Sequence, residues 1–228
     1  MGADECAASV FPCLEVLKME YCGKLITAPG HFPSIKELII SSLSSQALEK
    51  MSSTITTLEH VEFDSVSGPE LNLVLERMLV KNKFLRKISI FDCDDLSFLP
   101  SGLGNLAYLS EASLVYCSSL TCFPSGLCLP VSLDRLKIAH CPKLMVANPV
   151  PNKPMSLKEL TLKGFETLTI DWTRFLLSLT GLRSLVIGKT FSVNFLQIDI
   201  DFMANVITGF AAGPIAHVTE GVNSADYA

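Results

Sequence analysis

The middle of the sequence holds a group of side chains that could bind a metal ion. Thiols and imidazoles are the ligands of structural zinc, which favours paired cysteines separated by about two to four residues. The densest such group consists of Cys117, Cys122, Cys128, His140 and Cys141. Because its spacings do not form those pairs, we expect neither a metal ion nor any other cofactor.

Nucleotide binding and nucleophilic catalysis are the other chemistries that the residue types suggest. Gly188-Lys189-Thr190 has the form of a P-loop ending, but the first glycine of that motif would fall at Arg183. No histidine lies in a recognisable motif with Ser or Cys; the four are His31, His60, His140 and His217. We therefore expect a chain that is not an enzyme, with a hydrolase on a repeat scaffold as the enzymatic alternative.

Composition narrows the class of protein. The 228 residues are 49% apolar and carry a net charge of −5, with a mean hydropathy of +0.40. The apolar content is sufficient for a sizeable core, and the acidity disfavours sequence-independent nucleic-acid binding. Neither a secretory signal nor a glycosylation sequon is visible, and the longest uncharged stretch, 202–219, contains Gly, Pro and Asn. We expect a cytoplasmic chain with free thiols and no membrane span.

A repeat organises most of the chain. The apolar pattern L-x-x-L-x-L occurs eight times, and its first positions are 21 to 27 residues apart. Its positions are Leu14, Leu17, Met19; Ile35, Leu38, Ile40; Leu58, Val61, Phe63; Leu85, Ile88, Ile90; Leu109, Ala112, Leu114; Leu133, Leu136, Ile138; Leu157, Leu160, Leu162; and Leu182, Leu185, Ile187. A period of about 20–29 residues is typical of leucine-rich repeats.

Each repeat predicts one short strand. In L-x-L, alternation places both apolar side chains on one face of a strand, which a single strand cannot bury alone. Stacking the strands into a parallel sheet lets each repeat cover its neighbour, and the wider return segments make the stack curve. The predicted fold is an α/β leucine-rich-repeat solenoid. Its curved parallel β-sheet lies on the concave side, and helices and turns lie on the convex side.

The same pattern sets the expected domain boundaries. We predict a flexible segment over 1–10, about eight repeats over 11–190, and a cap or partly disordered tail over 191–228. One or two strands are plausible within 191–202. Within 69–84, four apolar residues share a helical face, which predicts a helix; they are Leu71, Leu75, Met78 and Leu79. No polar cap precedes the first repeat, so we expect a piece of a longer protein or a chain that needs a partner at that end.

Short motifs after the strands carry a family resemblance. The strings CDDLSFLP at 93–100 and CSSLTCFP at 117–124 share the form C-x-x-L-x-x-[L/F]-P. CGKLITAP at 22–29 is a looser copy, and 141–144 has the variant C-P-x-L. In these motifs the chain resembles the leucine-rich-repeat region of plant nucleotide-binding leucine-rich-repeat disease resistance proteins.

The resemblance implies a non-catalytic protein-recognition module of a plant intracellular immune receptor. It would sense a pathogen effector or a guarded host protein, or restrain a nucleotide-binding switch module on another chain or in a longer parent protein. The alternative is a substrate adaptor of a ubiquitin ligase, or another scaffold protein. Such adaptors share the cysteine but usually continue with an Ile-Thr-Asp-like segment, whereas this chain continues with L-x-x-[L/F]-P.

Recognition by such a fold would use the inner strand face. Residues 133–191 hold nine bases and four acids, whereas the chain before them is acidic, which suggests a polarised surface for a protein partner. Exposed aromatic residues there are candidate anchors, although sheet preference alone also places aromatics in strands. The predicted binding residues are Lys18, Glu20, Tyr21, Glu62, Asp64, Phe91, Tyr116, Arg135, Lys137, His140 and Lys163. Ser89 and Ser113 are predicted to lie between them on the same face.

Overall fold

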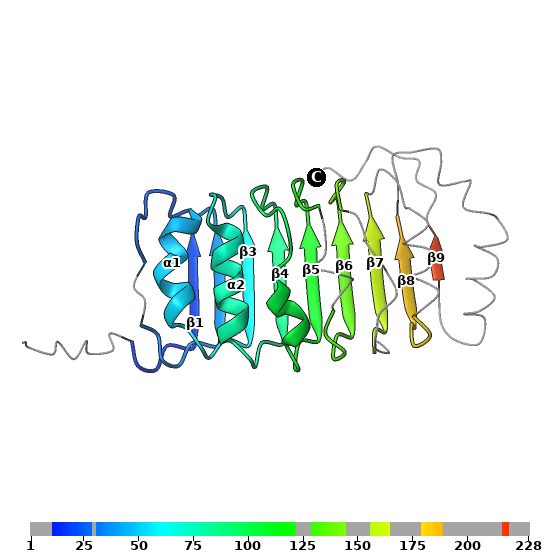
Figure 1. Ribbon diagram of the computed structural model, residues 1–228, viewed down its shortest axis with the longest axis horizontal. Helices are drawn as coiled ribbons and strands as arrows, with labels where there is room; N and C mark the ends of the chain where they lie inside the picture. Colours follow the sequence, from blue (N-terminus) through cyan, green and yellow to red (C-terminus); the bar gives the residue numbers. More distant parts are fainter. Residues whose placement is uncertain are drawn as a thin grey trace, which may run out of the picture.

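The computed structural model describes residues 11–28, 31–121, 129–144, 156–164 and 179–188, and the backbone of 216–218. These residues form one parallel β-sheet whose strands follow each other in chain order (Figure 1). The strands are β1 Val16–Glu20, β2 Glu37–Ser41, β3 His60–Asp64, β4 Lys87–Phe91, β5 Glu111–Val115, β6 Arg135–Ala139, β7 Glu159–Lys163, β8 Ser184–Ile187 and β9 Ala216–Val218. An α/β fold with a single parallel sheet and few helices is therefore confirmed.

Each strand pairs with the next in a constant register. Leu17 lies beside Leu38, which lies beside Val61, and the second residue of every later strand up to β8 continues this row. Alternation then turns the second and fourth residues of each strand to the core. Of the apolar pattern positions, all are buried except Leu14, Leu17 and Met19, which are partly buried.

Two α-helices cover the core face of the first strands, and they lie side by side in front of the sheet in Figure 1. Helix α2 spans Leu71–Lys81 and buries Leu71, Leu75, Met78 and Leu79, which confirms the predicted helix. Helix α1 spans Ser45–Thr54 and starts where the Ser44 side chain accepts a hydrogen bond from the N–H of Gln46. The 3₁₀ helix η1 spans Ser101–Asn105, between β4 and β5.

A buried amide joins the two helical segments. Asn82, directly after α2, donates from Nδ2 to the carbonyl oxygens of Ile55 (3.0 Å) and Met78 (2.8 Å). Its Oδ1 accepts from the backbone N–H of Leu58 at 2.8 Å. Since these backbone groups are removed from water, Asn82 supplies the hydrogen bonds that they would otherwise lack.

Candidate functional site

The face of the sheet that none of the described helices covers carries every predicted binding residue. We define the open face as the first, third and fifth residues of each strand from β1 to β7, the residue after each of these strands, and the matching positions of β8. Arg135 is a first residue, and Lys18, Glu62 and Lys137 are third residues. The fifth residues include Glu20, Asp64, Phe91 and Lys163, and the residues after the strands include Tyr21, Tyr116 and His140.

The residues that follow the strands have left-handed backbone conformations. Tyr21, Ser42, Ser65, Asp92, Tyr116, His140 and Gly164 have φ values between 49° and 66°. Except at Gly164, the backbone N–H of each donates to the last carbonyl oxygen of the next strand, as from Tyr116 to Ala139 (2.9 Å). The conformation costs about 1–2 kcal/mol for a residue with a side chain. Because the left-handed conformation recurs after each of these strands, it sets the direction of the whole row of side chains. This conformation was not predicted from the sequence.

Two aromatic rings stack in this row. Tyr116 and His140 have centroids 4.6 Å apart and planes 8° from parallel. The imidazole reaches the position where Gly164 lacks a side chain, since an added Cβ there would collide with Nδ1 of His140. Burial lowers the pKa of His140, and the charges of Lys163 and Lys137 lower it further.

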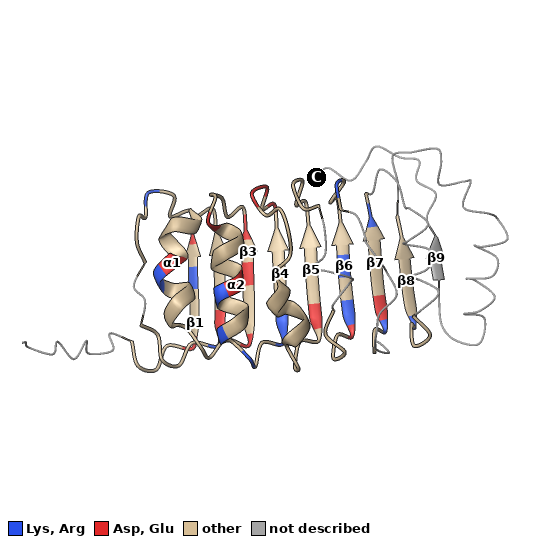
Figure 2. Ribbon diagram, in the orientation of Figure 1, with Lys and Arg blue, Asp and Glu red and all other residues tan. Residues whose placement is uncertain are grey.

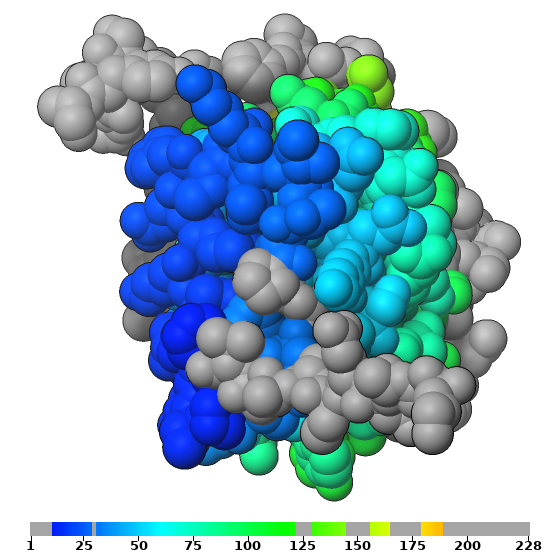
Figure 3. All heavy atoms as spheres, turned by 90° about the vertical axis from the view of Figure 1, so that its left-hand side faces the viewer, coloured from blue at the N-terminus to red at the C-terminus, as the bar shows by residue number. Residues whose placement is uncertain are grey.

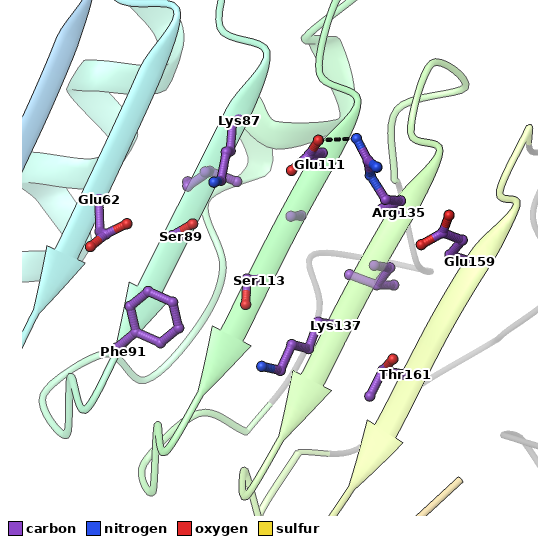
Figure 4. Close-up of a pocket in the computed structure, with 13 residues that line it drawn as sticks. Glu62, Lys87, Ser89, Phe91, Glu111, Ser113, Arg135, Lys137, Glu159 and Thr161 are labelled. Atoms are coloured by element: carbon purple, nitrogen blue, oxygen red, sulfur yellow. Dashed lines mark hydrogen bonds and ion pairs between the residues drawn. The ribbon is translucent and has the colours of Figure 1, made fainter. Parts of the chain in front are cut away.

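A hollow of about 350 Å³ lies over the centre of the open face, from β3 to β7 (Figure 4). Small side chains form its floor, including Ser89, Ser113 and Thr161. Ser89 lies on the predicted face but is buried, because it is a small residue of an inner strand with larger neighbours around it. Charged residues surround this floor: Lys87, Arg135 and Lys137 with Glu62, Glu111 and Glu159. Arg135 is paired with Glu111 across the two strands.

Charge divides the open face into two halves. In the third, fifth and following positions, the half over β1–β4 carries four acids and one base: Glu20, Glu62, Asp64, Asp92 and Lys18. The described part of the half over β5–β8 carries Lys137 and Lys163 and no acid at these positions. Figure 2 shows acids on β3 and just after β4, bases on β6 and at the end of β7, and further acids at the start of β5 and β7. The first positions, which also belong to the open face, add Arg135, Glu111 and Glu159 to the β5–β8 half. With them, the described part of this half carries three bases and two acids, whereas the β1–β4 half carries two bases and five acids. A partner on the β5–β8 half would thus meet a slight excess of positive charge, most of it at Lys137 and Lys163.

The aromatic candidates differ in exposure. Tyr21 is 83% exposed and Tyr116 is 55% exposed, as the sequence predicts, whereas Phe91 is half-buried beside the hollow. Large exposed rings are suited to anchoring a partner because they bury much surface at a small entropic cost. Tyr116, which follows β5, is the candidate anchor within the β5–β8 half, and Tyr21 lies at the β1 end of the sheet.

The cysteines after β4, β5 and β6 lie in the core. Cys93, Cys117 and Cys141 are free and buried, and each thiol donates to the carbonyl of the residue two before it, as from Cys93 to Phe91 at 3.1 Å. Cys122 and Cys128 of the predicted group lie outside the described residues. Among the residues that the structure describes, no three His, Cys, Asp or Glu side chains gather to hold a metal ion.

No family model, curated protein or solved structure matches this chain. The open face therefore has to be interpreted from its own chemistry. Across the described ranges, none of the helices combines the length and apolar character needed to cross a lipid bilayer.

Proposed function

We propose that the chain is a leucine-rich-repeat solenoid and a non-catalytic protein-recognition module that binds its partner on the open face. The repeat interpretation is supported by the constant register and by the recurrence of the same apolar pattern at each strand from β1 to β8. Crossovers between parallel strands have the same hand, so the described return segments lie on one side of the sheet and leave its other face open for binding.

The division of charge on the open face is the observation that supports recognition most directly. Lys137 and Lys163 form no ion pair with another described residue, although Arg135 nearby is paired with Glu111. Opposite charges on a partner increase the association rate and fix its orientation. We infer that the partner presents carboxylates to β6 and β7 and an apolar group to Tyr116.

The motifs after the strands support the class of module that we propose. The C-x-x-L-x-x-[L/F]-P strings support a cytoplasmic module of the plant intracellular immune receptor type. Its partner in this proposal is a pathogen effector, a guarded host protein, or a nucleotide-binding switch module. Each of these partners would act by binding one conformation of the receptor more tightly than another, and no chemical reaction would be needed.

Selection of peptides against the whole chain tests the proposal without a known partner. We expect phage-displayed random peptides that bind to be rich in Asp and Glu. Lys137→Glu with Lys163→Glu should weaken their binding at least tenfold, because carboxylates would then face carboxylates. Lys50→Glu with Lys83→Glu is the matched control, since it changes net charge equally at exposed positions off the open face.

Circular dichroism of both double variants should match that of the parent chain. Equal loss of affinity in both variants would indicate a general effect of net charge and would overturn the proposal. Selected peptides that protect α1 or α2, rather than β5–β7, from hydrogen exchange would also overturn it.

A further inference from the structure

The first strand of the sheet has an edge without a neighbour among the described residues. Tyr21 donates its N–H to Ser41, and the carbonyl of Glu15 accepts from Lys36 and Glu37, so these groups face β2. Successive residues of a strand direct their backbone groups to opposite edges. The N–H and C=O groups of the intervening residues, including Lys18 and Glu20, therefore point outward and can pair with another strand.

The core is also incompletely covered at this end. Leu17 and Met19 are only partly buried, whereas their counterparts on β2, Leu38 and Ile40, are completely buried. Ile26, in the segment between β1 and β2, is 72% exposed. Figure 3 looks onto this end of the molecule. Another strand beside β1 would complete the burial that β2 to β8 already receive from a neighbour on each side.

Elsewhere in the sheet, neighbouring strands match opposite charges. In the position before each strand, Glu15 pairs with Lys36 (2.6 Å), Glu59 with Arg86 (3.3 Å), and Asp134 with Lys158 (3.0 Å). On β1 itself, Lys18 and Glu20 both lie on the open face and form no ion pair with another described residue. A complementary strand would need an acid opposite Lys18 and a base opposite Glu20.

We propose that β1 pairs antiparallel with β1 of a second copy of this chain, about a twofold axis through Met19. This arrangement places Lys18 of each copy opposite Glu20 of the other, and the outward backbone groups of both residues form hydrogen-bonded pairs. The two Met19 side chains then meet on the core side and cover the open end of each core.

Other registers of the β1–β1 pair match charges or side-chain faces less well. A twofold axis through Lys18 would place the two Lys18 ammonium groups opposite each other. A shift to an axis between two residues would set open-face side chains against core side chains. Charge and alternation therefore select the same register. The inference concerns the edge of the sheet and does not rest on the function proposed for the open face.

Substitutions that reverse the charges of Lys18 and Glu20 in the full chain test this dimer. Sedimentation velocity over a range of concentrations measures the dissociation constant of each variant. The parent chain should dimerise. Lys18→Glu and Glu20→Lys should each raise the dimer dissociation constant at least tenfold, because like charges would meet twice. The double variant Lys18→Glu with Glu20→Lys should restore dimerisation. An equimolar mixture of the two single variants should form heterodimers, because one then carries two acids and the other two bases.

Lys50→Glu is the control, since it alters an exposed lysine on α1 and should leave the dimer unchanged. A parent chain that stays monomeric at high concentration would overturn the proposal, as would a double variant that is no better than the single ones. Open-ended assembly would also overturn it, because antiparallel pairing of two β1 edges closes after two copies.

Discussion

The imidazole of His140 occupies the space that Gly164 leaves by having no side chain. The two residues follow neighbouring strands, β6 and β7, and both have left-handed backbones. Tyr116 stacks on the other side of the ring, so the imidazole lies between an aromatic face and a glycine. A single methyl group added at Gly164 would therefore displace the imidazole and disturb its stacking on Tyr116.

Gly164→Ala should therefore destabilise the fold by about 1–3 kcal/mol. The left-handed φ of 66° disfavours a side chain, and the new methyl group would displace His140. Urea denaturation of both chains measures the difference. In Gly181→Ala the new Cβ would lie no closer than 3.9 Å to a neighbour, so this control should change stability by less than about 0.5 kcal/mol. Equal effects of the two substitutions would contradict the arrangement.

Acid should weaken the fold through His140. Burial and the charges of Lys163 and Lys137 hold its pKa below the ordinary value, which is about 6.5 in an unfolded chain. The unfolded state therefore takes up the proton first, and stability falls as pH decreases from about 6.5 to the folded pKa. His140→Gln should remove this part of the pH dependence in urea denaturation.

An NMR titration of the imidazole gives the pKa of His140 directly. We expect Lys163→Met to raise it, because a neighbouring positive charge is lost, and Lys50→Met to leave it unchanged. A folded-state pKa at or above that of a short histidine peptide would show that the ring is open to water.

Asn82→Ala should cost about 2–4 kcal/mol, because several buried backbone groups lose their hydrogen bonds. Asn72→Ala is a useful comparison. Asn72 bonds to Ser97 at a partly exposed position, so its loss should cost less than half as much. Thermal denaturation followed by circular dichroism ranks the two variants, and the reverse order would show that Asn82 does not join the helical segments as described.

Cys93 should resist alkylation in the folded chain. Burial raises its pKa to about 12, so almost no thiolate is present at pH 8, and the sulfur is shielded from solvent. Cys13 is exposed and should react readily with iodoacetamide under the same conditions. Peptide mass spectrometry measures both, with a sample in urea as the control. Rapid labelling of Cys93 without denaturant would place it outside the core.

Periodicity was sufficient to predict β1 to β8 but neither β9, which lies in the predicted cap or tail, nor all of the return segments. The apolar residues of α2 recur at helical spacing and identify that helix. Helix α1 also buries Ala47, Leu48 and Met51, but its second half is rich in Ser and Thr, which have weak helix propensity. The local Ser44 cap and packing against α2 stabilise α1, and the packing forms only in the folded chain.

The geometry of the open face was only partly predictable. Alternation correctly placed Lys137 and Lys163 there, because side-chain direction in a strand follows position alone. The left-handed conformation of Tyr116 and His140 has no sequence signature, since neither residue is glycine. Alignment of the residue after each strand would have placed Gly164 beside His140. The stacking of Tyr116 on His140 could not be predicted from the sequence, because it depends on the direction of both side chains.

Chain order and spatial order coincide along this sheet, since β1 to β9 pair only with their sequence neighbours in the described part of the chain. A mechanical load applied to the two ends would therefore meet no clamp formed by distant segments. Extension should peel strands away in succession, each release lengthening the tether by a similar increment, and the rest would remain folded.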